Sequence, residues 1–296
     1  MPHGSTLSIF DSSMSLISTS ELAARIGDPR LRVLDARWYI DPAKKGLDAY
    51  RAGHIPGAFF ADLDADFSAP GGARGGALGR HPFPSSAQIQ NVIRLYGITR
   101  GVTVVAYDDA AGAMAARVWF VLRANGFDDC LILDGGITKW IAEGRAVTDQ
   151  PPSVSTMTDF VVDPRPELVL SKQQLVEEKD KSLVFDSRSA ERYRGDTEPI
   201  DPRAGHIPGA RSSPYTLNLT PGPNPVFKSP EELRARFEES GITKETSPVF
   251  YCGSGITAAH NLLALHVAGL SGRLYAGSWS EWSSDPSLPI ATGDQP

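Results

Sequence analysis

The 296-residue chain lacks several features that would place it in a special class of protein. It has two cysteines, Cys130 and Cys252, which are too few for a disulfide scaffold and typical of a reducing compartment. No CxxC or HExxH spacing predicts a metal site, and no apolar run reaches the roughly 20 residues that span a bilayer. Residues 1–15 lack the basic and apolar regions of a secretory signal, so we expect a cytoplasmic protein without a membrane partner.

The chain also lacks an excess of basic residues. Its 29 Lys and Arg are outnumbered by 35 Asp and Glu, and the net charge is −6. Because binding to phosphates needs a basic face, this charge argues against a nucleic-acid partner. An anionic substrate would therefore need a local positive potential, built from a few arginines and backbone N–H groups.

An internal repeat predicts the architecture. The octapeptide RAGHIPGA occurs at 51–58 and again at 203–210. Short apolar runs around it also correspond between the two halves: 31–37 with 182–188, 103–109 with 248–253, and 130–136 with 272–278. These runs alternate with helix-like segments, which predicts a parallel sheet covered by helices in each half.

Helix signals and a proline-rich segment divide the chain. A capping box with proline at the first helical position begins at Ser229, and 114–127 and 256–270 have a helical period. The segment 149–166 is proline-rich and breaks the pattern, so it is the expected linker. We predict two tandem doubly wound α/β domains: an N-terminal domain over 15–148 and a catalytic C-terminal domain over 167–296.

The repeat serves as an internal control, because a feature found in both halves is most simply explained by the fold. His54 and His206 occupy the same place in the two octapeptides and are therefore predicted to be structural. The same prediction applies to charged residues that recur at matching places, Asp35 with Asp186 and Arg37 with Arg188.

One loop differs between the halves in a way that predicts chemistry. The segment 252–257, CGSGIT, runs from a strand into a helix, whereas the first half has an acidic counterpart at 108–113. Such loops lie where α/β sheets bind ligands, and their N–H groups form an anion-binding nest that also stabilises a thiolate. Cys252 is therefore the predicted nucleophile. Cys130 begins an apolar strand without a nest and is expected to be structural.

Three motifs in order resemble those of the tandem rhodanese-type sulfurtransferases: GHIPGA, the Cys252 loop and YAGSWSEW at 275–282. The resemblance covers about residues 16–290 and implies an enzyme that carries sulfur as a persulfide on Cys252, without a metal or organic cofactor. A CGSG[VI]T loop is similar to that of 3-mercaptopyruvate sulfurtransferases, whereas thiosulfate sulfurtransferases carry basic residues after the cysteine. The resemblance thus implies transfer from 3-mercaptopyruvate to a thiol such as that of thioredoxin, or to cyanide, with release of pyruvate.

The resemblance also implies an arginine for the donor's carboxylate. Arg192, which the first half replaces by Asp41, matches the family's carboxylate-binding arginine, and one guanidinium can hold a carboxylate through two parallel hydrogen bonds. Arg203 follows a shortened proline-containing stretch and is the candidate for a second arginine. Further substrate contacts are expected from four loop residues: Gly253, Gly255, Ile256 and Thr257.

Two residues of the first half match the family's hydrogen-bonded relay to the loop serine. The expected chain joins Asp62, His81 and Ser254, and it would polarise the donor's thiol or carbonyl. A glycine-rich insert at 71–79 directly precedes His81.

Three other functions remain open from the sequence. Thiosulfate is the main alternative donor in the same fold. A phosphatase on a similar scaffold favours arginine where this chain has Ala258, and a non-catalytic binding module disagrees with the intact cysteine loop.

Overall fold

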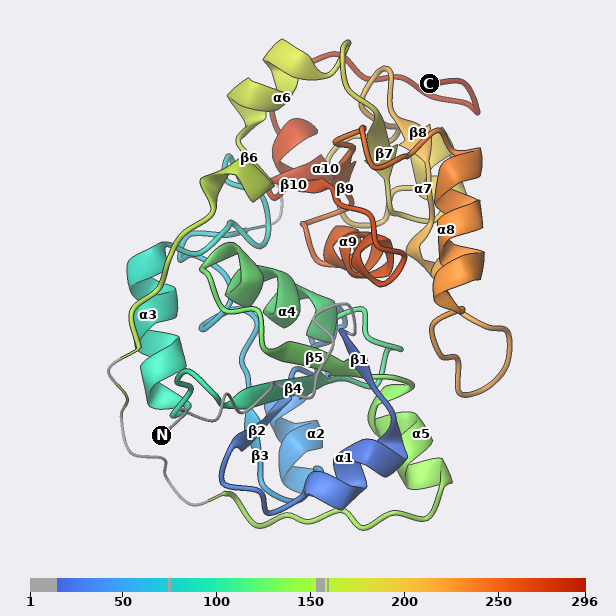
Figure 1. Ribbon diagram of the computed structural model, residues 1–296. Coiled ribbons are helices and arrows are strands. Elements are labelled where there is room, and N and C mark those ends of the chain that lie inside the picture. The colour runs from blue at the N-terminus through green and yellow to red at the C-terminus, as the bar shows by residue number, and fades with distance from the viewer. Residues whose placement is uncertain (1–14, 74–75, 153–157, 159) are drawn as a thin grey trace, which may run out of the picture.

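The computed structural model describes residues 15–73, 76–152, 158 and 160–296. Parts of the predicted insert (74–75) and of the predicted linker (153–157 and 159), together with residues 1–14, lie outside the described residues. Two α/β units lie one above the other in Figure 1, the first drawn from blue to green and the second from yellow to red. None of the helices in the described part is long and apolar enough to cross a membrane.

The first sheet has the strand order β1-β5-β4-β2-β3, and its neighbouring strands pair in parallel. Its strands are β1 (Leu16–Ile17), β2 (Leu31–Asp35), β3 (Ala58–Phe60), β4 (Thr103–Tyr107) and β5 (Cys130–Leu133). The helices are α1 (Thr19–Arg25), α2 (Gly46–Ala52), α3 (Ser86–Leu95), α4 (Ala115–Ala124) and α5 (Gly136–Ala142).

The second sheet repeats this topology with the order β6-β10-β9-β7-β8, again parallel. Its strands are β6 (Val169–Leu170), β7 (Val184–Asp186), β8 (Arg211–Ser212), β9 (Val249–Tyr251) and β10 (Arg273–Tyr275). The helices are α6 (Lys172–Glu178), α7 (Ala190–Arg194), α8 (Pro230–Glu239), α9 (Thr257–Val267) and α10 (Ser278–Trp282), with short 3₁₀ helices η1 (Pro166–Leu168) and η2 (Tyr215–Asn218). The two parallel sheets expected from the repeat are confirmed.

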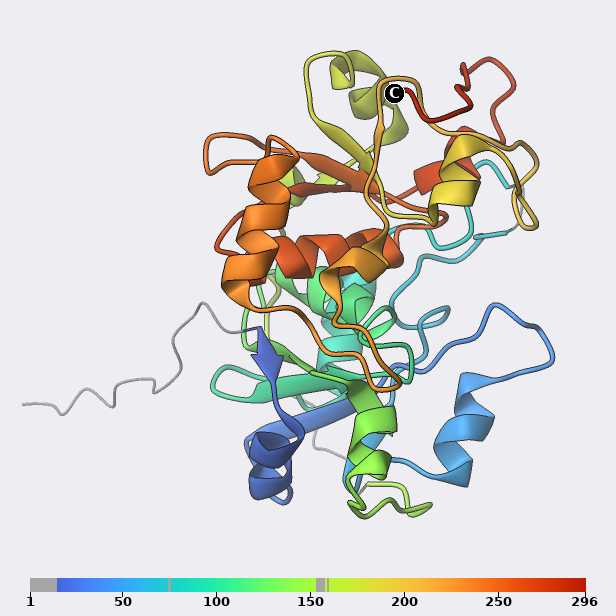
Figure 2. The same ribbon diagram turned by 90° about the vertical axis from the view of Figure 1, so that its right-hand side faces the viewer.

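Helices α4 and α9 pack against each other between the two sheets (Figures 1 and 2). Nearly all of their residues are buried, because each helix contacts its own sheet on one side and the other domain on the other side. One cluster of buried apolar side chains includes members of both domains, among them Val121 of α4 and Leu262 of α9. The domains therefore share a core and hold their facing loops in a defined arrangement.

The capping box predicted at Ser229 is present. The Ser229 side chain accepts from the Glu232 N–H, the Glu232 carboxylate accepts from the Ser229 N–H, and Pro230 is the first residue of α8. Leu233 and Phe237, four residues apart on one face, are buried as their spacing predicts.

The paired histidines are structural, as the repeat predicts. His54 is buried, with Nδ1 2.9 Å from the Tyr50 carbonyl and Nε2 3.1 Å from that of Gln150. His206 repeats the arrangement, with Nδ1 2.8 Å from the Tyr193 carbonyl. Each imidazole also stacks on the ring of that tyrosine, so both histidines hold the octapeptide turn in place.

The paired ionic residues are structural as well. Asp35 and Arg37 form a buried ion pair at 2.6 Å, and Asp186 and Arg188 repeat it at the same distance. In each domain the arginine also donates to the glycine carbonyl of the GHIPGA motif. The pair thus ties the end of one strand to the turn that precedes the next.

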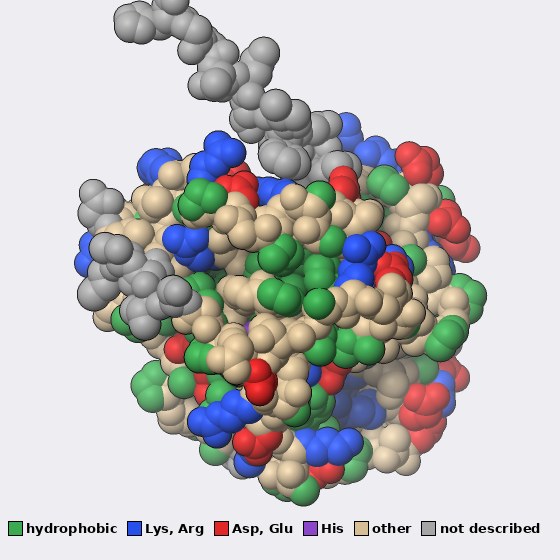
Figure 3. Space-filling view, turned by 90° about the horizontal axis from the view of Figure 1, so that it is seen from below, with side chains coloured by type: hydrophobic (Ala, Val, Ile, Leu, Met, Phe, Trp, Pro, Cys, Tyr) green, Lys and Arg blue, Asp and Glu red, His purple; other side chains and the backbone are tan. Residues whose placement is uncertain are grey.

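The surface carries charges of both signs. Figure 3 views the molecule from below Figure 1, where the first domain lies, and shows an apolar patch among interspersed basic and acidic side chains. This mixture on the visible face agrees with the small negative net charge of the chain.

Candidate active site

The Cys252 thiol lies directly after strand β9, at the carboxyl edge of the second sheet. Its residue is 2% exposed, and its Sγ accepts hydrogen bonds from the Gly255 N–H at 3.1 Å and the Ser254 N–H at 3.4 Å. These two amides form the nest expected from the glycine-rich loop. Ile256 and Thr257, also expected there, lie at the start of α9, and in the described part of the chain their N–H groups do not bond Sγ.

The closing motif at 275–282 fixes the Cys252 loop through hydrogen bonds. The Ser278 hydroxyl accepts from the Cys252 N–H at 3.2 Å, and the Trp279 N–H donates to the Cys252 carbonyl at 2.9 Å. Ser278 has a left-handed backbone at φ 55°, which a non-glycine residue adopts at some cost. Gly255 is also left-handed at φ 78°, and a Cβ there would lie 2.6 Å from the Ala276 carbonyl oxygen. The loop geometry therefore requires glycine at 255.

The equivalent loop of the first domain is occupied by its own carboxylate. Asp108 is fully buried and accepts from four backbone N–H groups at 2.7–2.9 Å, those of Ala110, Gly112, Met114 and Ala115. An acid in this position closes the nest against any other anion. The first domain thus has a hydrogen-bonded carboxylate where the second domain has the Cys252 thiol.

Cys130 lies in strand β5 and is 1% exposed. Burial raises the pKa of its thiol well above the usual range, so Cys130 stays protonated and is structural, as expected.

The predicted relay forms with a different acid. His81 Nδ1 lies 2.8 Å from Ser254 Oγ, and His81 Nε2 lies 3.1 Å from Asp64 Oδ1. Asp62 is instead turned toward its own loop, where Oδ1 accepts from the N–H groups of Asp64 and Ala65. The sequence expectation of Asp62 is therefore corrected to Asp64, because Asp62 is used to shape the turn that presents Asp64 to His81.

Trp38 contacts both Asp64 and His81. Its indole Nε1 donates to Asp64 Oδ2 at 2.9 Å, and its ring meets that of His81 edge-on with centroids 4.9 Å apart. Burial lowers the pKa of His81, while the bond to Asp64 acts in the opposite direction. His81 is thus neutral at neutral pH, and because Asp64 is an acceptor, Nε2 carries the proton and Nδ1 accepts from Ser254.

Arg192, in α7, faces the cysteine loop, but two of its three guanidinium nitrogens already donate to carboxylates of the protein. Its Nε and Nη2 donate to Glu198 at 3.2 and 2.7 Å, and Nη2 also donates to Asp201 at 3.1 Å. The remaining nitrogen, Nη1, lies 3.5 Å from the position that a Cβ on Gly253 would take. This guanidinium therefore cannot hold the carboxylate of a sulfur-donor substrate through two parallel hydrogen bonds, as the sequence analysis expected.

Arg203 has a structural role. Its Nε donates to the Ser283 carbonyl at 2.7 Å, Nη1 to that of Leu288 at 3.1 Å and Nη2 to that of Trp282 at 3.1 Å. All three nitrogens thus fasten the segment after α10. The expectation that Arg203 binds the donor is corrected, because no N–H edge of its guanidinium is left for a ligand.

Two arginines from the first domain reach the site without having been predicted. Arg117, in α4, is fully buried and donates to the carbonyls of Gly255 at 3.3 Å and His81 at 3.1 Å. Burial lowers its pKa to about 10, and the charge of Cys252 acts in the opposite direction. Arg80 pairs with Asp201 across the domain boundary, and its main-chain N–H donates to Ser280 Oγ at 3.1 Å.

One further signal was available in the repeat. Trp38 follows Asp-x-Arg in the first half, where the second half has Ser189, so the comparison that singled out Cys252 also marks Trp38. Asp64, Arg80 and Arg117 carry no comparable local signature, because distant residues define their roles. Asp64 contacts His81, Arg80 pairs with Asp201, and Arg117 bonds the Gly255 carbonyl.

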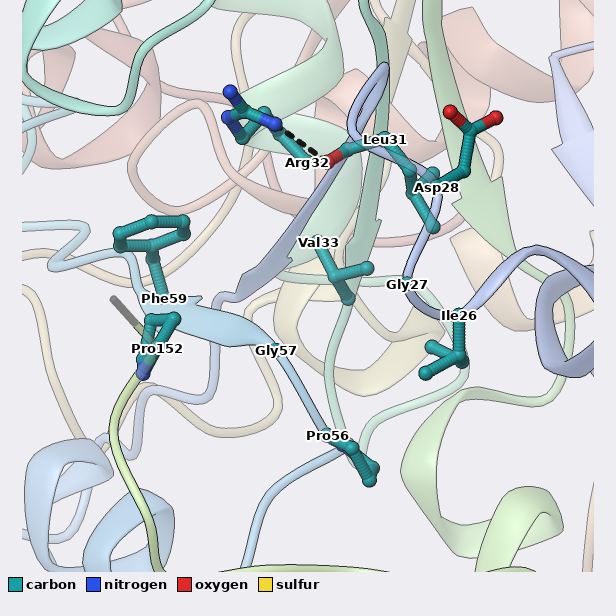
Figure 4. A pocket seen from close by; sticks show the side chains of 10 residues that line it. All are labelled: Ile26, Gly27, Asp28, Leu31, Arg32, Val33, Pro56, Gly57, Phe59 and Pro152. Atoms are coloured by element: carbon teal, nitrogen blue, oxygen red, sulfur yellow. Dashed lines mark hydrogen bonds between the residues drawn. The ribbon is translucent and has the colours of Figure 1, made fainter. Parts of the chain in front are cut away.

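Cavities lie away from Cys252 in both domains, and one of about 550 Å³ lies beside Leu168 and Arg273 in the second domain. A cavity of about 230 Å³ at the amino edge of the first sheet is lined mainly by apolar side chains and backbone, with the Arg32 guanidinium donating to the Leu31 carbonyl (Figure 4). No nucleophile lines it, so it is not the chemical site. A third cavity, of about 310 Å³, is lined by Trp38, Lys45 and Asp64 at the carboxyl edge, and it gives the relay access to solvent.

This chain is similar to known proteins along nearly its whole length. The model of the rhodanese-like domain matches it twice, at residues 18–143 and 171–285. It is 43% identical over 288 residues to a "Probable 3-mercaptopyruvate sulfurtransferase" of Pseudomonas aeruginosa, covering 96% of this chain and 100% of that one. It is 41% identical to a Mycobacterium tuberculosis protein provisionally named thiosulfate sulfurtransferase SseB, covering 94% and 97%. The structure of 3-mercaptopyruvate sulfurtransferase from Leishmania major superposes with a TM-score of 0.78 at 30% identity, covering 92% and 74%.

The family model accounts for both domains, and the relatives align along nearly the whole chain. The repeat, the cysteine loop and the closing motif therefore have one explanation: this chain belongs to the tandem-domain rhodanese-type sulfurtransferases.

Proposed function

We propose that this enzyme transfers sulfur from 3-mercaptopyruvate through a persulfide on Cys252. The observation that carries the proposal is the Cys252 thiol held by two N–H groups beside the Ser254–His81–Asp64 chain. A thiol donor needs such a chain, since a proton must leave its sulfur. The high identity to the Pseudomonas aeruginosa protein supports the same donor.

The transfer of sulfur in this scheme needs no cofactor. The Cys252 thiolate attacks the donor sulfur, an S–S bond forms, and the S–C bond breaks with its electron pair left on carbon. The thiol proton of the donor ends on that carbon, which gives pyruvate and a Cys252 persulfide. The N–H groups of Ser254 and Gly255, which bond Sγ in the resting enzyme, supply the donors that hold the anionic outer sulfur.

The relay moves the proton in this scheme. Neutral His81 accepts from the Ser254 hydroxyl through Nδ1, and Asp64 stabilises the charge that develops on the ring. Asp64 is 62% exposed, so the chain leads from the Ser254 hydroxyl, in the cysteine loop, to solvent. Arg117, buried beside the loop, provides a fixed positive charge next to the thiolate.

The acceptor in this proposal is a small thiol, a protein thiol such as that of thioredoxin, or cyanide, which attacks the outer sulfur and restores Cys252. We place the enzyme in the cytoplasm, since Cys130 and Cys252 are both unpaired thiols and such thiols are kept reduced there. Thiosulfate is the second candidate donor, because the Mycobacterium tuberculosis relative carries that name.

Donor kinetics combined with intact-protein mass measurement tests the proposal. Incubation with 3-mercaptopyruvate and no acceptor is expected to add one sulfur atom at Cys252, and kcat/KM for this donor should exceed that for thiosulfate. Addition of a thiol or cyanide should remove the added mass. Faster turnover with thiosulfate than with mercaptopyruvate would instead identify the alternative donor.

A pair of acid substitutions tests the corrected relay. Asp64→Asn is expected to lower kcat for mercaptopyruvate by about 10²-fold or more, because His81 loses the acceptor that sets its tautomer. Since Asp64 raises the pKa of His81, its loss should also shift the acid limb of the pH–rate profile to lower pH. Asp62→Asn is the matched control, two residues away. Its amide oxygen can still accept from the N–H groups of Asp64 and Ala65, so both quantities should stay nearly unchanged. The reverse pattern would restore Asp62 to the relay.

A further inference from the structure

Ser280, in α10, bonds the main chain of both segments that form the hydrogen bond between Ser254 and His81. Its N–H donates to the Gly253 carbonyl at 2.9 Å, and its Oγ accepts from the Arg80 N–H at 3.1 Å. Gly253 directly precedes Ser254, and Arg80 directly precedes His81. One fully buried residue of the second domain therefore holds the main chain next to both partners of that bond.

Arg117 makes a second connection on the other side of the same hydrogen bond. It donates to the Gly255 carbonyl at 3.3 Å and to the His81 carbonyl at 3.1 Å. Gly255 directly follows Ser254, so the cysteine loop is tied to the segment 79–82 both before and after the hydroxyl-bearing residue. The 2.8 Å contact between His81 Nδ1 and Ser254 Oγ thus depends on two bridging residues, Ser280 and Arg117.

The last glycine of the insert at 71–79 allows the close approach to Ser280. Gly79 has a left-handed backbone at φ 75°, and a Cβ there would lie 2.8 Å from both the Gly277 carbonyl oxygen and Ser280 Oγ. Ser280 Oγ is itself held in place, because it donates to that carbonyl at 3.1 Å. The hydroxyl therefore uses its proton on Gly277 and a lone pair on Arg80. A larger residue at 79 would push the two segments apart.

We propose that Ser280 is a positioning residue for sulfur transfer, which sets the distance between His81 and Ser254. Packing of α4 on α9 brings the domains together, and Ser280 then aligns the His81 segment with the cysteine loop. Its N–H and its hydroxyl are both used within the protein, so it acts through His81 and not on the donor. This inference rests on the proposed function, since the relay serves a donor that must lose a thiol proton.

Substitution of Ser280 tests the proposal by kinetics. Ser280→Ala is expected to lower kcat for mercaptopyruvate by about 10- to 100-fold, because a small displacement of a catalytic group has an effect of this size. KM should change by less than about threefold, since the lost hydroxyl bonds only the protein.

Ser284→Ala is the matched control. The Ser284 hydroxyl also donates to the carbonyl three residues before it, but among the described residues it makes no bond to the first domain. It should leave kcat unchanged. Equal kcat losses in the two variants, or no loss in Ser280→Ala, would overturn the proposal.

A double-mutant cycle with His81 separates positioning from a general loss of structure. Once His81→Gln has removed the imidazole, Ser280→Ala should lower kcat by no more than about twofold further. A residue that only stabilised the fold would lower kcat by the same factor with or without the imidazole. A second loss of about 10- to 100-fold in the His81→Gln enzyme would therefore contradict a role through His81.

Gly79→Ala disturbs the same contact from the first domain. Its methyl group would meet Gly277 and Ser280, so it should lower kcat as Ser280→Ala does. Gly71→Ala is its control, because Gly71 is also left-handed, at φ 89°, but a Cβ there would lie 3.7 Å from Leu78 of the same insert. Both variants carry the backbone strain, and only Gly79→Ala collides with the second domain. Equal kcat in the two variants would overturn the proposal.

Crystal structures of the variants provide a readout that does not depend on turnover. In Ser280→Ala the separation of His81 Nδ1 and Ser254 Oγ should exceed about 3.5 Å, the limit of a hydrogen bond, whereas Ser284→Ala should keep the wild-type contact. If the wild type prefers thiosulfate but this separation increases, the proposed donor is wrong and the positioning role of Ser280 stands. An unchanged contact in Ser280→Ala would overturn that role, whichever donor the enzyme uses.

Discussion

Replacing Cys252 with serine is expected to abolish sulfur transfer from every donor. A serine hydroxyl is not ionised at neutral pH, and its oxygen forms no stable bond to sulfur that could serve as a carrier. The surrounding N–H groups and Arg117 remain in place, so the protein should fold normally while gaining no mass on incubation with donor. Steady-state rates and intact mass after donor treatment measure the result.

The second thiol of the chain provides the control for that substitution. Cys130→Ser should retain nearly full activity, because Cys130 is buried in β5 and its raised pKa keeps it protonated. It should lower thermal stability instead, since a hydroxyl is placed among apolar side chains. Substantial turnover by Cys252→Ser, or loss of turnover in a well-folded Cys130→Ser, would contradict the assignment of the nucleophile.

Replacing Arg192 with alanine is expected to lower kcat/KM for mercaptopyruvate by roughly 10²- to 10³-fold, mainly through KM. Truncating one partner of a desolvated charge pair costs about 2–5 kcal/mol, and each 1.4 kcal/mol corresponds to tenfold. Folding should be affected much less, because the buried carboxylates keep other partners: Glu198 retains Arg188, and Asp201 retains Arg80. Kinetics with both donors and a thermal melt measure the two effects separately.

Arg194, two residues further along α7, is the matched control. It pairs with Asp196 on the surface and does not face the cysteine loop, so Arg194→Ala should leave KM unchanged. An unaltered KM in Arg192→Ala would mean that Arg192 serves only to hold Glu198 and Asp201.

The sequence predicted most of the fold because the evidence for it is local and occurs twice. Short apolar runs, a capping box and the duplicated octapeptide depend on neighbouring residues. The structure has a strand at each apolar run, a helix at the capping box and a matching turn in the two octapeptides. Burial of α4 and α9 between the domains was not foreseen, since their apolar composition alone does not say which surface they cover.

The errors in the predicted site came from residues whose partners lie far along the chain. Asp62 and Asp64 are both aspartates of the same short segment, so the sequence does not distinguish them. The tertiary structure alone shows which of them faces His81. Arg203 and Arg80 are likewise both basic residues near proline, yet Arg203 bonds the carbonyls that follow α10, while Arg80 reaches Asp201 in the other domain.

The sequence by itself determined that the protein has two α/β domains, and it predicts that one of them carries the nucleophile, Cys252. Each conclusion depends on the chemistry of a short segment: a strand, a turn, or a glycine-rich loop opening a helix. The tertiary structure decided which side chains surround the thiol. Arg80, Asp64 and Arg117 belong to the first domain, and they lie around the Cys252 loop only because α4 packs on α9. Such long-range contacts follow from the packing of whole domains, which no local pattern specifies.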